Sequence, residues 1–178
     1  MRYVGSTTLL AAFAAIAIAS PAFAQSTPAA QPPAGGTPAA MPFDIPYGVS
    51  IGLELAKKAM AAAEAEAKAK NWKMNIAIVD TNGELVHFSR MEGAQIASVA
   101  IAEGKARTAA RFRRETRVFY NAFETGHPYI GTLDPTLVAS PGGFPLVVGG
   151  KLIGAIGCSG GTGDQDAAIC KVGADAVK

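Results

Sequence analysis

Apolar and polar positions follow two different periods in the first half of the chain. Residues 49–70 place apolar side chains three and four apart, which predicts a helix with a narrow buried stripe of small residues and Ser50 as its N-cap. Residues 73–79 and 84–90 alternate with a period of two around Asp-Thr-Asn-Gly. Because Asn-Gly tolerates positive φ, this pattern predicts a β-hairpin.

The second half of the chain again contains both the helical spacing of three to four residues and the strand period of two. Helices are predicted over 95–113 and 115–123, a loop over 126–135, a short strand at 138–139, and a second hairpin from 145–148 and 151–159. Thr162 and Gln165 form the capping pair expected for a last helix over 163–177. Two hairpins with helices between them predict an α+β fold, in which helices flank an antiparallel sheet of about five strands.

The N-terminal pattern differs from the rest. Arg2, an apolar run over 9–19 and the small-x-small site Ala22-Phe23-Ala24 predict a cleavable signal peptide over 1–24, with an uncleaved membrane anchor as the alternative. Residues 25–46 are rich in Pro, Ala and Gly and predict a disordered tether. One domain then covers 47–178. We expect a periplasmic or secreted protein with no stable membrane span after cleavage.

Charge and cysteine content narrow the picture. The formal net charge is +2, and loss of Arg2 with the signal peptide leaves +1, so nothing in the overall charge draws the domain to nucleic acid or membrane. Cys158 and Cys170 are the only cysteines. An oxidising compartment permits a disulfide between them, and two buried free thiols are the alternative.

Histidines and a basic run are the residues that suggest chemistry. His87, in a predicted strand, and His127, in a predicted loop, are the only histidines and are candidate iron ligands or proton-transfer groups. The basic run extends from Lys105 to Arg117 and suits carboxylates such as heme propionates, or else forms a solvated face or subunit contact. The loop at 160–163 is either an anion site or a tight structural turn.

Several motifs occur in the order typical of one family. They are Arg90-Met91-Glu92-Gly93-Ala94, Lys105-Ala106-Arg107-Thr108-Ala109, Pro141-Gly142-Gly143-Phe144-Pro145 and the stretch from Gly150 to Gly160, followed by Asp166. With these motifs, residues from about 47 to 174 resemble the GlcG/HbpS-like heme-binding (heme-degrading) family. Two positions depart from it: position 87 is His where many members have an aromatic or apolar residue, and position 158 is Cys where Val is usual.

The resemblance implies a profilin-like fold, homo-oligomerisation and, in exported members, heme binding with slow heme breakdown and iron release in some. The expected cofactor is therefore heme. The candidate binding residues are His87, Arg90, Lys105, Arg107, Thr108 and His127, with His87 or His127 approaching iron.

Two further functions stay open. One is an enzyme that holds a small carboxylated metabolite through Arg90 and Lys105 at a subunit interface. The other is a ligand-free partner of a membrane sensor.

Overall fold

The computed structural model describes Met1, Met41 and residues 43–178. Apart from Met1, the predicted signal peptide lies outside the described residues, as does most of the predicted tether. The elements follow in the order α1 (Leu53–Ala69), β1 (Asn75–Val79), β2 (Leu85–Arg90), α2 (Ser98–Phe112), α3 (Arg117–Glu124), the 3-10 helix η1 (Pro128–Thr132), β3 (Gly143–Val148), β4 (Lys151–Ser159) and α4 (Gly163–Asp175).

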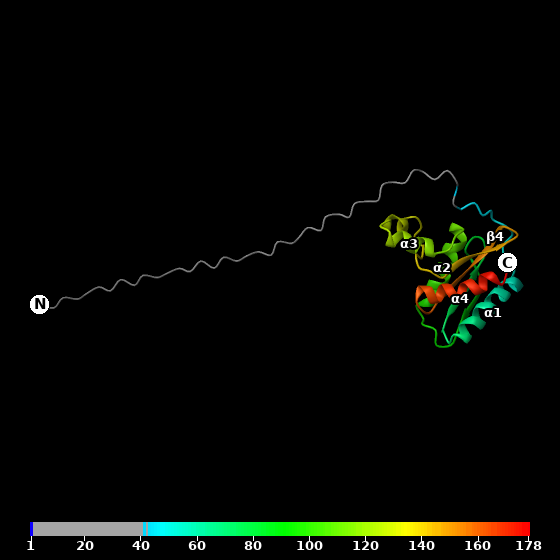
Figure 1. The fold of residues 1–178 in the computed structure, drawn as a ribbon, viewed down its shortest axis with the longest axis horizontal. Helices are drawn as coiled ribbons and strands as arrows, with labels where there is room; N and C mark the ends of the chain where they lie inside the picture. The colour runs from blue at the N-terminus through cyan, green and yellow to red at the C-terminus, as the bar shows by residue number, and fades with distance from the viewer. Residues whose placement is uncertain (2–40, 42) are drawn as a thin grey trace. The chain divides into compact units, whose positions relative to one another are not determined.

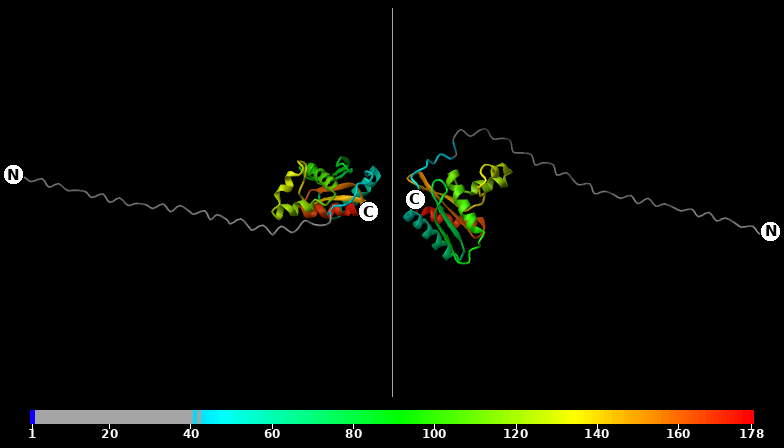
Figure 2. Two further views of the ribbon diagram at one scale, coloured as in Figure 1. Left: turned by 90° about the horizontal axis from the view of Figure 1, so that it is seen from above. Right: turned by 180° about the vertical axis from the view of Figure 1, so that it is seen from behind.

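The sheet is antiparallel, and its strand order is β2-β1-β4-β3. Helices α1 and α4 pack side by side on one face, and α2 covers the other face (Figure 1). Both views in Figure 2 keep α1 beside α4. Because helices cover both faces, all five residues of β1 are buried, whereas the edge strand β2 is only half-buried.

The predicted α+β class and both hairpins are confirmed. Gly83 has φ +89°, and Asp80 accepts hydrogen bonds from the backbone N–H groups of Asn82 and Glu84, as the Asp-Thr-Asn-Gly turn requires. The Thr162–Gln165 capping box is present at the start of α4. The profilin-like label stays a prediction.

Two expectations about local structure are wrong. The described residues form four strands, not about five, because residues 138–139 form no strand: the Val138 N–H donates to Thr108 Oγ1 on α2 at 2.9 Å. Helix α1 begins after Gly52 and not at Ser50, since the Ser50 hydroxyl is hydrogen-bonded to Thr81 at 2.7 Å.

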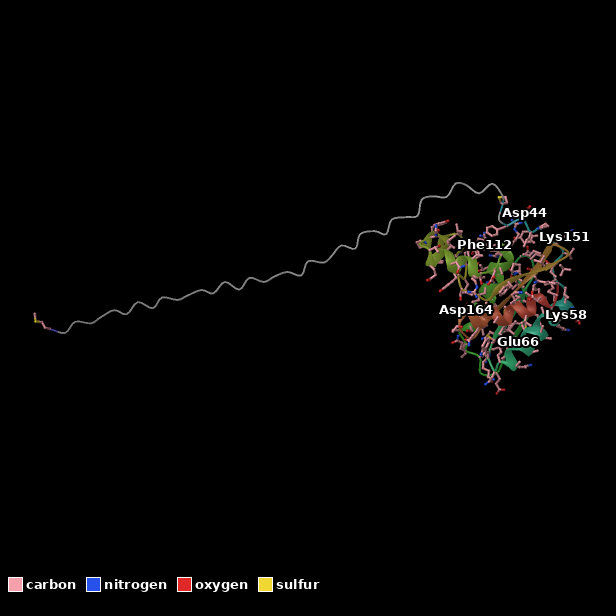
Figure 3. All side chains as sticks on the ribbon, in the orientation of Figure 1. Asp44, Lys58, Glu66, Phe112, Lys151 and Asp164 are labelled. Carbon is pink, nitrogen blue, oxygen red and sulfur yellow. A yellow bond between two sulfur atoms is a disulfide. The ribbon has the colours of Figure 1, made fainter. Side chains whose placement is uncertain are left out.

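The stripe of small residues on α1 is buried as predicted and contacts α4 and the sheet. Charged residues such as Lys58 and Glu66 lie on other sides of this helix (Figure 3). The cysteines form a disulfide, Cys158–Cys170, with Cα atoms 5.6 Å apart, and it joins β4 to α4.

Residues before the predicted domain boundary also contact the domain. The Arg114 guanidinium lies 3.3 Å from the centroid of the Phe43 ring, and Arg113 donates to the Ile45 carbonyl at 3.0 Å. The Leu152 N–H donates to the Pro46 carbonyl at 2.9 Å. Contacts with the domain therefore begin at least four residues before Tyr47.

Gly157 allows α2 to approach the sheet closely. A Cβ at this position would lie 2.2 Å from the Ala102 carbonyl oxygen and 2.5 Å from the Ala106 nitrogen. We expect Gly157→Ala to lower the free energy of unfolding by about 1–3 kcal/mol, because backbone atoms of a packed helix would have to move. Urea denaturation would measure it, and a change below about 0.5 kcal/mol, the usual range for surface substitutions, would contradict the close approach.

Candidate functional site

Family-motif residues converge on a buried ion pair between α2 and α4. The Lys105 ammonium donates to Asp166 Oδ2 at 2.7 Å and to the Cys158 carbonyl oxygen at 3.2 Å. Both side chains are almost fully buried, with exposed fractions of 1% and 3%. The other oxygen of Asp166 accepts the N–H groups of Gly160 and Gly161 at 3.0 and 2.9 Å. This pair therefore fixes the glycine-rich loop that precedes α4.

Burial and the facing carboxylate act on Lys105 in opposite directions. Desolvation lowers the pKa of its ammonium below the usual 10.5, and the charge and hydrogen bond of Asp166 oppose that shift. The amine has no exposed surface of note, so its position favours support of the surrounding loops over contact with a ligand.

Thr116 holds a second loop beside this pair. Its buried hydroxyl donates to the Ser140 carbonyl at 2.6 Å and accepts the Gly143 N–H at 2.9 Å, and its own N–H donates to the Gly143 carbonyl at 3.0 Å. The Pro-Gly-Gly segment is thereby tied to the start of α3. Two motif loops, one before β3 and one before α4, are thus held rigidly next to each other.

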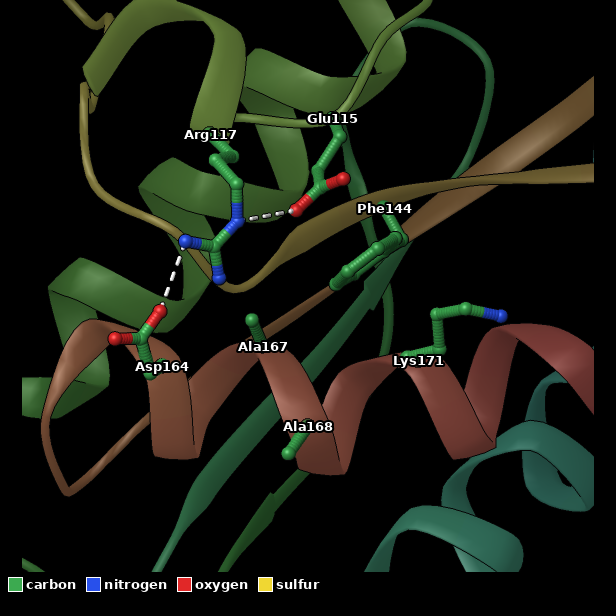
Figure 4. A pocket seen from close by; sticks show the side chains of 7 residues that line it. All are labelled: Glu115, Arg117, Phe144, Asp164, Ala167, Ala168 and Lys171. Atoms are coloured by element: carbon green, nitrogen blue, oxygen red, sulfur yellow. Dashed lines mark hydrogen bonds and ion pairs between the residues drawn. The ribbon is translucent and has the colours of Figure 1, made fainter. Parts of the chain in front are cut away.

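A shallow pocket of about 390 Å³ lies over these loops, between α3, β3 and α4. Its lining combines charged and apolar side chains: Glu115, Arg117, Phe144, Asp164, Ala167, Ala168 and Lys171. Figure 4 shows the Arg117 guanidinium between Glu115 and Asp164, with Phe144 and the alanines of α4 beside it. The pocket therefore has an apolar side and a charged side.

Arg117 separates this pocket from a smaller one. A cavity of about 180 Å³ shares Arg117 and Asp164 and adds Tyr120, Ser140 and Pro141 to its lining. Arg117 Nη1 lies 2.8 Å from Asp164 Oδ1, and the hydrogen bond that the guanidinium donates to Asp164 raises the pKa of Arg117. The Asp164 side chain is 83% exposed, so this ion pair is open to solvent and to competing anions.

The smaller cavity shares Arg117 and Tyr120 with a set of side chains on α3, η1 and the loop between them, which we call the α3 surface: Arg117, Tyr120, Phe123, His127 and Tyr129. Tyr120, Phe123 and Tyr129 are 40%, 40% and 59% exposed. The rings of His127 and Tyr129 meet edge to face with centroids 6.2 Å apart. Helix α3 lies at the end of the domain away from α1 (Figure 1). Exposed aromatic side chains grouped in this way are typical of binding surfaces.

The hydrogen bonds of Thr125 orient the His127 imidazole. The Thr125 hydroxyl donates its one hydrogen to backbone carbonyls of α3, with Asn121 O at 2.9 Å. Its oxygen lies 3.2 Å from His127 Nδ1, and which of these two atoms donates depends on the tautomer of the ring. In the tautomer with the proton on Nδ1, the Nε2 lone pair is free, which is the arrangement a metal-binding histidine needs.

Three of the predicted binding residues lie on α2 and face different surroundings. Lys105 is buried in its ion pair, and Thr108 is buried with its hydroxyl accepting from Val138. Arg107 is half-buried against the first hairpin, where its Cγ would lie 2.8 Å from a Cβ on Gly83. These three side chains therefore do not form one surface for a carboxylate.

The two predicted residues on β2 lie elsewhere again. His87 is half-buried and pairs with Ile78, which places it on the sheet face covered by α1. Arg90, at the end of β2, is exposed. His127 follows α3, and the chain beyond it returns over α2 on the other face through Val138. The structure thus separates His87 from His127.

The rest of the basic run is dispersed as well. Arg111 donates to the Asn82 carbonyl, Arg113 to the Ile45 carbonyl, and Arg114 stacks on Phe43. Arg111 thus contacts the first hairpin, whereas Arg113 and Arg114 contact the segment that precedes the domain. The expected single basic face is therefore not present in the described structure, because these contacts divide the run among several neighbours.

Sequence reasoning missed Thr116 and Thr125 as parts of a site, whereas it placed Arg117 in the basic run expected to suit carboxylates and Phe144 in a family motif. Both residues of the central ion pair, Lys105 and Asp166, stood in family motifs, but neither was expected as the partner of the other. Thr125 stands two residues before His127, a spacing that could have suggested a hydroxyl partner for the imidazole. The others meet through long-range contacts that no local pattern signals.

No group of three or more His, Cys, Asp or Glu side chains among the described residues could hold a metal ion. No helix in the same part of the chain is both long and apolar enough to cross a membrane.

Comparison with known proteins finds relatives that match most of the domain. The family model described as Haem degrading protein HbpS-like matches residues 51–175. Protein GlcG of Escherichia coli (strain K12) is 40% identical over 111 residues, which are 62% of this chain and 82% of GlcG.

Solved structures agree with these matches. The crystal structure of HbpS is 28% identical and superposes with a TM-score of 0.68, covering 76% of this chain and 95% of HbpS. A crystal structure of PduOC in complex with heme is 27% identical, also with a TM-score of 0.68, covering 73% of this chain and 96% of that one.

Proposed function

Because this chain belongs to the HbpS-like family, we propose that it binds heme on the α3 surface. The heme complex of the relative PduOC supports the ligand. The observation that carries the choice of surface is His127, whose Nδ1 lies within hydrogen-bond distance of the Thr125 hydroxyl and whose ring meets the exposed ring of Tyr129 edge to face. Apolar surface with one well-placed polar ligand is what a cofactor of this kind requires.

The residues of the α3 surface fit the three parts of heme. His127 Nε2 would bind the iron, and heme when bound supplies a redox-active metal centre. Tyr120, Phe123 and Tyr129 would cover the macrocycle. Arg117 would hold a propionate by exchanging it for the exposed Asp164 carboxylate, which is a small loss because solvent-exposed ion pairs contribute little.

Replacing each histidine separately tests the iron ligand. We expect His127→Ala to weaken hemin binding at least about tenfold and to change the position of the Soret band, because the axial nitrogen is lost. His87→Ala is the matched control and should bind hemin like the wild type, since His87 lies on the other sheet face. Titration with hemin followed by absorbance measures both.

Weaker hemin binding in His87→Ala, with unchanged binding in His127→Ala, would assign the iron to His87. An unchanged spectrum in both single variants and in the double variant would remove histidine coordination altogether. Thr125→Val, which leaves His127 in place but removes its hydrogen-bond partner, should give an intermediate loss that Thr125→Ser restores.

Export, predicted from residues 1–24, is the second part of the proposal. The Cys158–Cys170 disulfide supports it, because disulfides form and persist in oxidising compartments outside the cytoplasm. Fractionation of cells expressing the full chain or residues 25–178 alone would test it. Residues 25–178 alone should stay in the cytoplasm. Recovery of the full chain from the cytoplasm, uncleaved, would contradict the proposal.

Heme breakdown, iron release and homo-oligomerisation, which the family resemblance implies, stay predictions. Incubating the heme-loaded protein with a mild reductant and an iron chelator would measure release of iron. Light scattering of the apo and heme-loaded forms would give the number of subunits in each.

A further inference from the structure

A second concave site lies away from the α3 surface, where the end of α1 meets the end of β2. It has a volume of about 340 Å³. Its lining is Glu64, Lys68, Lys73, Ser89, Arg90, Met91 and Glu92, and we call it the Arg90 pocket. β2 and β3 are the two edge strands of the sheet, so the Arg90 pocket and the pocket beside Phe144 lie at opposite edges.

The charges in the Arg90 pocket are not balanced within the chain. Glu64 is already engaged, because one of its oxygens accepts the Ser89 hydroxyl and the other lies 3.5 Å from the Lys68 ammonium. Lys73 donates only to the neutral Asn71 side chain, at 3.1 Å. The Arg90 backbone pairs with Asn75 in the sheet, whereas its side chain makes no hydrogen bond or ion pair within the described residues. Within the described residues, the side chains of Lys73, Arg90 and Glu92 therefore line one cavity without an ion-pair partner, two of them cations and one a carboxylate.

The two cations differ in a way that indicates their ligand. The Arg90 guanidinium presents a planar fork that matches a carboxylate through two parallel hydrogen bonds, whereas the Lys73 ammonium is a point charge that accepts any anion. With three cations and two carboxylates in the lining, the pocket keeps one positive charge in excess. The sequence predicted that Lys105 would bind a carboxylate together with Arg90, but Lys105 is buried in its ion pair with Asp166. In the structure, the cation that lines the pocket together with Arg90 is Lys73.

We propose that the Arg90 pocket binds a small dicarboxylate, with one carboxylate on Arg90 and the other on Lys73. Met91 adds an apolar side chain to the lining for the carbon chain between the two acids. The volume is within the range of small-molecule sites in proteins. Binding of this kind is independent of heme, because no residue of the Arg90 pocket belongs to the α3 surface.

Titration of the purified chain with malonate at constant ionic strength tests the proposal. We expect a saturable rise in the melting temperature and a heat of binding by calorimetry. Arg90→Gln should weaken malonate binding about tenfold or more, because a charge-assisted hydrogen-bond pair is lost, and Lys73→Gln should weaken it by a smaller factor. Lys58→Gln removes a charge from α1 outside the pocket and should leave binding unchanged.

Three results would overturn the proposal. The first is malonate binding that is unchanged in Arg90→Gln. The second is an equal rise in melting temperature with sodium chloride, which would reduce the effect to charge screening. The third is tighter binding of inorganic phosphate than of malonate, which would remove the preference for carboxylates.

Two controls separate this site from folding and from heme. Arg90 is exposed at the end of β2, so Arg90→Gln should keep the wild-type melting temperature without ligand. Hemin titration of the same variant should also match the wild type. A loss of hemin binding there would place a propionate on Arg90 and would contradict the independence of the two sites.

Discussion

Replacing Lys105 by Met should lower the free energy of unfolding by about 3–5 kcal/mol, because it leaves the Asp166 carboxylate buried without its partner charge. The lost ammonium also donates to the Cys158 carbonyl, so a second hydrogen bond disappears with it. Urea denaturation followed by circular dichroism measures the change. If the variant is unfolded at the outset, Asp166→Asn, which keeps an acceptor for Lys105, supplies a milder test of the same pair.

A matched ion pair on the surface gives the control. Lys171 lies 2.6 Å from Asp175 on α4, and both side chains are about half exposed. Lys171→Met should cost less than about 1 kcal/mol, because solvent already stabilises both charges. Equal losses in the two variants would contradict the structural role of the buried pair.

The double replacement Lys105→Met with Asp166→Leu adds a second comparison. Removing both charges avoids the unpaired carboxylate, so the double variant should recover much of the stability lost in Lys105→Met. The Gly160 and Gly161 N–H groups would still lose their acceptor, so recovery should be incomplete. This remaining loss measures how far Asp166 stabilises the loop before α4.

Reduction of the Cys158–Cys170 disulfide should lower the free energy of unfolding by about 3 kcal/mol, the loop-entropy value for cysteines 12 residues apart. For a domain of this size the melting temperature should fall by about 10 °C. Scanning calorimetry with and without a strong reductant measures the effect. Both cysteines are fully buried, so reduction must be checked by counting thiols after denaturation.

The double variant Cys158→Ala with Cys170→Ala provides the control. It should melt near the reduced wild type, apart from the small cavity that the missing sulfurs leave, and should not respond to reductant. A reduced wild type that melts like the oxidised protein would show that packing alone holds α4 on β4. The result also bears on export, since the same chain retained in a reducing cytoplasm would lack this stabilisation.

Two separate sites would give the domain two independent ligands. The α3 surface presents an imidazole nitrogen beside aromatic rings, and the Arg90 pocket presents two unpaired cations. The first follows from family membership together with the geometry of His127, and the second from charge balance within one cavity. Hemin and malonate titrations of the same variants will show whether the two sites act alone.

The sequence by itself determined the elements and their order. Apolar periods of two and of three to four residues place the hairpins and the helices, and Asn82-Gly83 and Thr162–Gln165 determine a turn and a helix start through contacts only a few residues apart. Such signals are local, so they can be read without knowing what packs against them. The family motifs marked Asp166 as a characteristic position, but they did not indicate which residue it contacts.

Tertiary structure alone decided which side chains meet. Lys105 reaches Asp166 across 61 positions and so becomes a buried support, although its neighbours in the sequence suggest a basic surface. Helix spacing shows which residues share a face, but it does not show what long side chains contact. Arg113 donates a hydrogen bond to the Ile45 carbonyl, and Arg117 forms an ion pair with Asp164, and both partners lie in other segments. The sheet order, the disulfide and the separation of His87 from His127 depend likewise on long-range packing, because no local pattern specifies which strand or helix lies alongside another.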